Sequence, residues 1–134
     1  MNDSEESLVD KLGIKPKYCI TIINPPEGFE DQLGDLPESV RVENFLEEVE
    51  FDLIHFFTQD RAELEQQFDY LKNCLNANGM LWVSWPKKTA KLVSNLDENQ
   101  IREVGLTGGL VDVKVCVVDD DWSALKFVYR KADR

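Results

Sequence analysis

The last third of the chain contains the stretch that decides the fold, VDVKVCVVDDDWSALKFVY at residues 111–129. Valine recurs at every second position from Val111 to Val117, and a period of two is typical of a β-strand. We therefore predict a strand over Val111–Val118, a turn at Asp119–Asp121 and a returning strand over Trp122–Tyr129. The two strands should form an antiparallel hairpin with one wetter face.

Strand and helix patterns alternate along the chain before this hairpin. Apolar runs predict further strands at Tyr18–Ile23, Val40–Asn44, Phe51–Phe57 and Met80–Trp85. Helical patterns occupy Ser4–Leu12, Asn24–Leu33, Asp60–Leu75 and Asp97–Val104. Such alternation predicts an α/β fold with a mostly parallel sheet and right-handed crossovers. We expect one domain over residues 1–134, with an N-terminal helix in residues 1–13 and an α/β core over 14–130.

Composition limits the classes of partner. The 134 residues carry a net charge of −11, and this field would repel a nucleic-acid backbone. We therefore predict no nucleic-acid partner. No apolar run approaches the roughly 20 residues that span a bilayer, and the acidic start MNDSEESLVDK is unlike a secretory signal. No membrane partner and a cytoplasmic location are expected. The cysteines are too far apart in the sequence to suggest a metal site.

A mostly parallel sheet closed by an antiparallel hairpin resembles the Rossmann-like fold of methyltransferases. Two phrases are similar to phrases in that superfamily: Phe51–Ile54 on a central strand, and Asn76–Leu81 before the next one. The resemblance covers about residues 14–130 and lacks one βα unit of the usual fold. It implies a mostly parallel Rossmann-like (methyltransferase-like) sheet with a C-terminal antiparallel β-hairpin. It also implies an S-adenosylmethionine site, made by a glycine-rich turn after the first strand and an acidic residue after the second.

The loop after the first strand departs from that pattern, because it reads Asn24-Pro25-Pro26-Glu27-Gly28. Proline has no amide hydrogen to donate, and Glu27 places a negative charge where an anion would be attracted. The residues instead suggest a helix start, with Asn24 as the N-cap, Pro25 as the first helical residue and Glu27 completing a capping box. We therefore predict no cofactor, with S-adenosylmethionine as the alternative.

Ligands of open α/β sheets bind at the carboxyl ends of the strands, and we place a candidate site there. Lys87 and Lys88 would supply positive charge, and Trp85 a stacking surface. The first-strand loop would form the opposite wall. The candidate ligand-binding residues are Asn24, Glu27, Gly28, Phe29, Thr58, Gln59, Trp85, Lys87 and Lys88. We predict no catalytic residue and no metal ligand. The single histidine, His55, lies mid-strand and is expected in the core.

Nearly the whole chain resembles a family of small bacterial proteins known only as a domain of unknown function. The stretches that carry the resemblance are Leu8–Pro16, Asn24–Phe29, Trp82–Lys88, Gly109–Val115 and Trp122–Val128. This family brings no activity, substrate or catalytic residue with it.

Three functional hypotheses follow from these observations. The first is a non-catalytic methyltransferase-like domain that binds a small anionic ligand or a protein partner at the strand carboxyl ends. The second is a diverged S-adenosylmethionine-dependent methyltransferase that uses Gly28, Glu43 and Gln59. The third is an interaction subunit whose acidic first third binds a basic partner.

Overall fold

A computed structural model describes residues 7–43 and 50–134 of the chain. The strands are β1 Cys19–Ile23, β2 Arg41–Val42, β3 Phe51–Phe57, β4 Leu75–Pro86, β5 Leu110–Val117 and β6 Trp122–Tyr129. The helices are α1 Leu8–Leu12, α2 Phe29–Leu33, α3 Arg61–Asn73 and α4 Glu98–Thr107, followed by a short 3₁₀ turn at Lys131–Asp133. The ends of the predicted helix Ser4–Leu12 and strand Val40–Asn44 lie outside the described residues.

All six strands belong to one sheet with the order β2-β1-β3-β4-β6-β5. The pairs β2–β1, β1–β3 and β3–β4 are parallel, whereas β4–β6 and β6–β5 are antiparallel. This topology confirms the predicted fold, a mostly parallel methyltransferase-like sheet that ends in an antiparallel hairpin.

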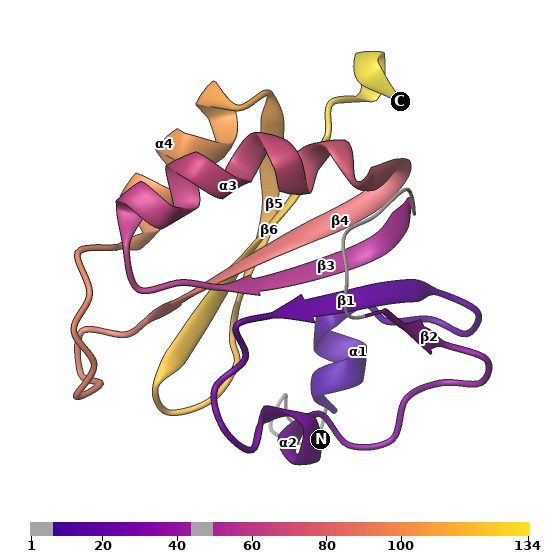
Figure 1. Ribbon diagram of the computed structural model, residues 1–134, viewed down its shortest axis with the longest axis horizontal. Helices are drawn as coiled ribbons and strands as arrows, with labels where there is room; N and C mark the ends of the chain where they lie inside the picture. The colour runs from indigo at the N-terminus through magenta and orange to yellow at the C-terminus, as the bar shows by residue number, and fades with distance from the viewer. Residues whose placement is uncertain (1–6, 44–49) are drawn as a thin grey trace.

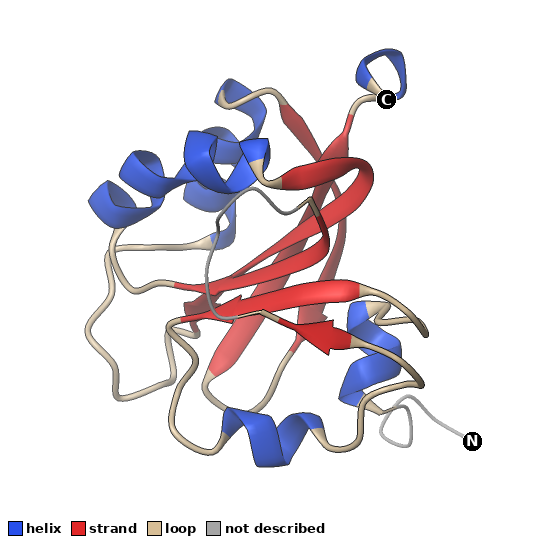
Figure 2. Cartoon of the chain, turned by 45° about the vertical axis from the view of Figure 1, so that its right-hand side comes forward, coloured by secondary structure: helices blue, strands red, loops and turns tan. Residues whose placement is uncertain are grey.

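The sheet lies between two helical layers, and Figure 1 shows α3 and α4 over one face with α1 and α2 at the other. Figure 2 shows the strands crossing between these layers. Side chains of β4 alternate between the two cores: Leu81 and Trp85 pack under α3 and α4, whereas Trp82 packs with α1. Because both faces are covered, β4 reads as a continuous apolar run rather than an alternating one. No helix in the described ranges is both long and apolar enough to cross a membrane.

Helix α3 follows the predicted pattern. The side chain of Asp60 caps its first turn by accepting a hydrogen bond from the amide of Ala62 at 3.4 Å. Its buried face consists of Leu64, Phe68 and Leu71, spaced four and three residues apart as one face of a helix requires. The helix ends two residues earlier than the predicted Leu75, since that residue already pairs with β3.

The sequence Asn76–Gly79, which follows the predicted helix, is part of strand β4. The pairing of β3 with β4 shifts register between Phe51 and Leu53, so the extra residues form an irregularity inside the ladder rather than a helix end. A Cβ atom at Gly79 would lie 2.7 Å from the carbonyl oxygen of Phe51, so the close backbone approach requires glycine there.

The helix predicted from Asn24 is also different, because α2 begins at Phe29 with Gly28 as its N-cap. Asn24 has a φ of +57°, whereas an N-cap residue has extended backbone angles. The amide of Phe29 donates to the carbonyl of Pro26 at 3.1 Å, so the chain turns before it enters the helix. Burial of Phe29, which is only 1% exposed, fixes this later start.

Candidate ligand-binding cleft

A cavity of about 570 Å³ lies at the carboxyl ends of β1 and β3. We call it the carboxyl-end cleft, and its lining residues are Asn24, Pro25, Pro26, Phe57, Thr58, Gln59, Asp60, Glu63, Leu92, Asp121 and Trp122. Neighbouring parallel strands end at the same edge of a sheet, so the residues after β1 and β3 lie side by side. Strand β6 contributes because it runs antiparallel to β4 and begins where β4 ends, with Trp122 opposite Pro86.

Thr58 holds an acidic side chain at this cleft. Its hydroxyl, on a residue only 2% exposed, donates to Glu63 Oε1 at 2.6 Å and accepts from the amide of Asp60 at 3.3 Å. The Glu63 carboxylate is therefore fixed by a charge-assisted hydrogen bond rather than left to rotate in solvent.

Side chains after β3 also anchor the segment between β4 and α4. Gln59 donates its side-chain amide to the carbonyl of Val93 at 2.9 Å, and Asn95 donates to Asp60 Oδ1 at 3.0 Å. These contacts hold the segment beside the cleft, which Leu92 helps to line.

The charges on the cleft lining are all negative. Among the residues that the structure describes, Asp60, Glu63 and Asp121 line it, and no lysine or arginine does. Phe57 and Trp122 add an aromatic wall, with ring centroids 5.2 Å apart in an edge-to-face arrangement. Carboxylates beside aromatic rings complement a cationic group far better than an anion.

Three of the predicted site residues, Asn24, Thr58 and Gln59, meet in this cleft. Glu27, Gly28 and Phe29 line a separate hollow of about 320 Å³. Phe29 is a core residue, since its ring meets the edges of other buried rings.

The predicted opposite wall lies elsewhere. Trp85, Lys87 and Lys88 line another pocket of about 370 Å³, together with Asp97 and Glu98 at the start of α4. The strand explains the separation, because Trp85 points into the core under α3 and α4 while Phe57 and Trp122 point into the other core. Trp85 is 6% exposed and packs in the core under α3 and α4. A ligand-binding role of the two lysines stays a prediction.

Among the lining residues that the sequence prediction left out are Asp60, Glu63, Leu92, Asp121 and Trp122. Glu63 lies within the predicted helix Asp60–Leu75, and Asp121 lies in the predicted turn. The available signal was the hairpin itself, because an antiparallel last strand beside β4 brings its first residues to the carboxyl edge.

His55 lies in the core as predicted, 1% exposed. Its Nε2 atom is 2.6 Å from the hydroxyl of Ser84, and its ring stacks on Phe57 at 4.3 Å. Burial lowers the pKa of His55 from 6.5 to about 3, so the ring is neutral near pH 7. Its Nδ1 atom has no hydrogen-bond partner in the described part of the chain. His55 does not line the cleft, but its ring packs against Phe57, which does.

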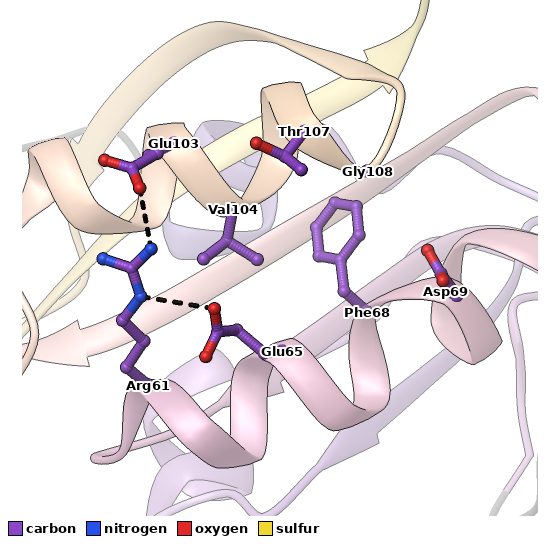
Figure 3. A pocket seen from close by; sticks show the side chains of 8 residues that line it. All are labelled: Arg61, Glu65, Phe68, Asp69, Glu103, Val104, Thr107 and Gly108. Carbon is purple, nitrogen blue, oxygen red and sulfur yellow. Dashed lines mark hydrogen bonds and ion pairs between the residues drawn. The ribbon is translucent and has the colours of Figure 1, made fainter.

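A second groove, of about 340 Å³, lies between α3 and α4 on the outer side of the helical layer. Figure 3 shows Phe68 and Val104 between the two helices and Arg61 at one end. Arg61 binds Glu103 at 2.8 Å and Glu65 at 3.5 Å, so the cation is already compensated. The Arg61–Glu103 pair joins the two helices.

No family model matches this sequence, and no curated protein matches it. Solved structures do match. An S-adenosylmethionine-dependent methyltransferase from Aquifex aeolicus superposes with a TM-score of 0.65 and 12% identity, over 93% of this chain and 88% of that one. A TehB-like methyltransferase from Corynebacterium glutamicum gives 0.59 and 14%, over 92% and 85%. The magnesium protoporphyrin IX methyltransferase ChlM from Synechocystis, with bound S-adenosylhomocysteine, gives 0.57 and 10%, over 92% and 78%.

These structures contradict the prediction that no cofactor is involved. ChlM has been solved with bound S-adenosylmethionine and with bound S-adenosylhomocysteine on the same fold. The prediction rested on one loop, Asn24–Gly28, whereas the sheet as a whole matches proteins that hold this cofactor. At identities of 10–14% the likeness shows the fold alone, and this chain has the Rossmann-like fold of the methyltransferases.

Proposed function

We propose that the chain is a diverged, methyltransferase-like domain that binds S-adenosylmethionine in the carboxyl-end cleft. One observation carries this proposal: three carboxylates and two aromatic rings line a single cavity at the carboxyl edge of a methyltransferase-like sheet. The cavity volume of about 570 Å³ lies within the range of small-molecule sites.

The charge of the cofactor suits this lining. S-adenosylmethionine carries a sulfonium and an ammonium group against one carboxylate, so it is a net cation. Glu63, held by Thr58, and the nearby Asp60 and Asp121 would attract its positive groups. Phe57 and Trp122 would provide the apolar wall. The bound cofactor would supply an electrophilic methyl group.

The backbone after β1 contributes less than in a glycine-rich turn. Pro25 and Pro26 have no amide hydrogen, and a Cβ atom added to Gly28 would meet nothing within 4 Å. Side chains would therefore carry most of the binding. Glu43 follows β2, with its amide bonded to the carbonyl of Ile20 at 3.0 Å, so it lies level with the middle of β1 and does not line the cleft.

Calorimetric titration with S-adenosylmethionine and with S-adenosylhomocysteine tests the proposal. The second compound lacks the sulfonium charge, so we expect it to bind about tenfold more weakly, which corresponds to ~1.4 kcal/mol. Glu63→Gln and Asp121→Asn should weaken binding of S-adenosylmethionine and reduce this difference.

The matched control is Lys87→Ala with Lys88→Ala, which changes charge in a different pocket and should leave both affinities unchanged. Absence of saturable heat with either compound would rule out the proposed function. Equal affinities that do not respond to Glu63→Gln would rule out the cleft.

A further inference from the structure

Two lysines lie opposite each other on the hairpin. Lys114 on β5 and Lys126 on β6 are cross-strand partners, and Lys126 is also the partner of Trp82 on β4. Directly opposed residues of an antiparallel pair project from the same face, so both lysines lie on the face that carries Trp82 and α1.

A third lysine reaches the same place from the other end of the chain. The indole nitrogen of Trp82 donates to the carbonyl of Leu12 at 2.8 Å, which fixes the end of α1 over this face. Lys15 follows three residues later. Burial lowers the pKa of Lys126, and the charges of Lys114 and Lys15 lower it further, so Lys126 interacts with both other lysines.

Within residues 7–43 and 50–134, no carboxylate compensates this cluster. The ion pairs there are made by Arg61 and Arg102, and no hydrogen bond or ion pair engages the side chain of any of the three lysines. Like charges directly opposite each other destabilise a sheet, and here one of them is half-buried. The other lysine pocket differs, because Asp97 and Glu98 line it beside Lys87 and Lys88.

We propose that Lys15, Lys114 and Lys126 form a binding site for a compact multivalent oxyanion, a phosphate group. Opposed residues on adjacent strands have Cβ atoms about 5 Å apart, close enough for one phosphate to meet several ammonium groups. The phosphate can be free or part of a small phosphorylated molecule. An extended polyanion would be repelled by the net charge of −11.

This site is separate from the carboxyl-end cleft and does not rest on the proposed function. Trp122, which lines the cleft, precedes Lys126 by four residues on β6, about 13 Å along the strand. Binding at one site can therefore be removed without removing the other.

Thermal unfolding with pyrophosphate and with glycerol 3-phosphate tests the site, against sodium chloride at equal ionic strength. We expect both phosphates to raise the Tm of the wild-type chain beyond the chloride control. A larger shift with glycerol 3-phosphate would indicate a phosphorylated molecule, and a larger shift with pyrophosphate a free anion; either supports the site.

Lys114→Gln gives the sharper result, because the two expected effects have opposite signs. Without phosphate, it should raise the Tm by a few degrees, since it removes a like-charge contact. The apparent affinity of this variant for pyrophosphate, obtained from the rise in Tm with concentration, should be at least tenfold lower than that of the wild type. Lys126→Arg keeps the charge and should keep binding. Lys87→Ala with Lys88→Ala should behave as wild type.

Several results would overturn the site. The first is that the phosphates raise the Tm no more than chloride does. The second is that phosphate stabilises the wild type and Lys114→Gln equally. The third is that Lys114→Gln lowers the Tm in the absence of phosphate. Calorimetry with S-adenosylmethionine on Lys114→Gln should give the wild-type result, so failure of this site and failure of the cleft are distinguishable.

Discussion

His55 links a single side chain to the acid sensitivity of the fold. It is fully buried against Phe57, and only one of its two ring nitrogens has a hydrogen-bond partner. A proton on this ring would be a buried charge without a counter-ion. The ring of His55 is therefore neutral in the folded state. Acid favours unfolding, because the ring can take up a proton more easily in the unfolded chain.

We predict that the free energy of unfolding falls as pH falls from about 6.5 toward 3. Burial holds the pKa of folded His55 at about 3, against 6.5 in the unfolded chain, so the unfolded state binds more protons across this window. Between pH 7.5 and 5 the loss from this residue is about 2 kcal/mol. Urea unfolding of wild type and His55→Phe measures it: the wild type should lose about 2 kcal/mol more than the variant, and equal losses would contradict the assignment.

At the scale of elements, helix α4 packs closely against the sheet at Gly105. A Cβ atom on Gly105 would lie 2.0 Å from Cε1 of Phe127 on β6. The helix therefore packs close to the strand, and its N-terminus is fixed by Asp97, which accepts a hydrogen bond from the amide of Gln100 at 2.8 Å. On the same side, Arg102 joins α4 to Asp112 of β5 at 2.9 Å.

Gly105→Ala should destabilise the fold although alanine is the better helix former. The added methyl group must displace the ring of Phe127, and such overpacking costs about 1–3 kcal/mol. The exposed Thr107→Ala on the same helix is the control and should change stability by less than about 0.5 kcal/mol. Chemical denaturation of both variants decides the point, and a stabilised Gly105→Ala would show that the helix shifts away freely.

The sequence predicted elements well where a pattern was long and local, as in α3 and the hairpin β5–β6. It failed where a distant contact decides the backbone. Asn24 and Pro25 look like a capped helix, yet burial of Phe29 delays the helix. Gly79 looks like a helix stop, yet it is needed for the close approach of Phe51.

The candidate site was predicted in part for the same reason. The loops after β1 and β3 could be placed together because parallel strands end at one edge. Which face Trp85 occupies depends on the pleat of β4 within the sheet. The lysines after it line a neighbouring pocket, although the amide of Lys87 donates to the carbonyl of Asp121 at 2.8 Å. Lys15, Lys114 and Lys126 are more than a hundred residues apart at the extremes, and only the topology brings them together.

At the scale of the whole molecule, charge is unevenly distributed. A net charge of −11 surrounds a cleft that is itself acidic and a face that carries three uncompensated lysines. The two proposed sites thus have opposite sign, so one molecule could hold a cation and an anion about 13 Å apart along the same strand.

The net charge also predicts a response to salt. We expect the free energy of unfolding to rise when sodium chloride increases from about 0.01 to 0.15 M, because the Debye length falls from about 30 to 8 Å and self-repulsion weakens. Urea unfolding at each concentration measures this. The same series near the isoelectric point, pH 4.5, is the control and should show little salt dependence. A decrease with salt near pH 7 would mean that ion pairs outweigh the repulsion.

The position of β6 has a consequence for synthesis. It is the last strand in sequence, yet it lies between β4 and β5 in the sheet. A chain emerging from the ribosome therefore has no neighbour for β5 until the final strand has been made. The outer edge of β4, and with it one wall of the cleft, stays open for the same time. Ligand binding in the proposed cleft would therefore have to wait until β6 has been synthesised.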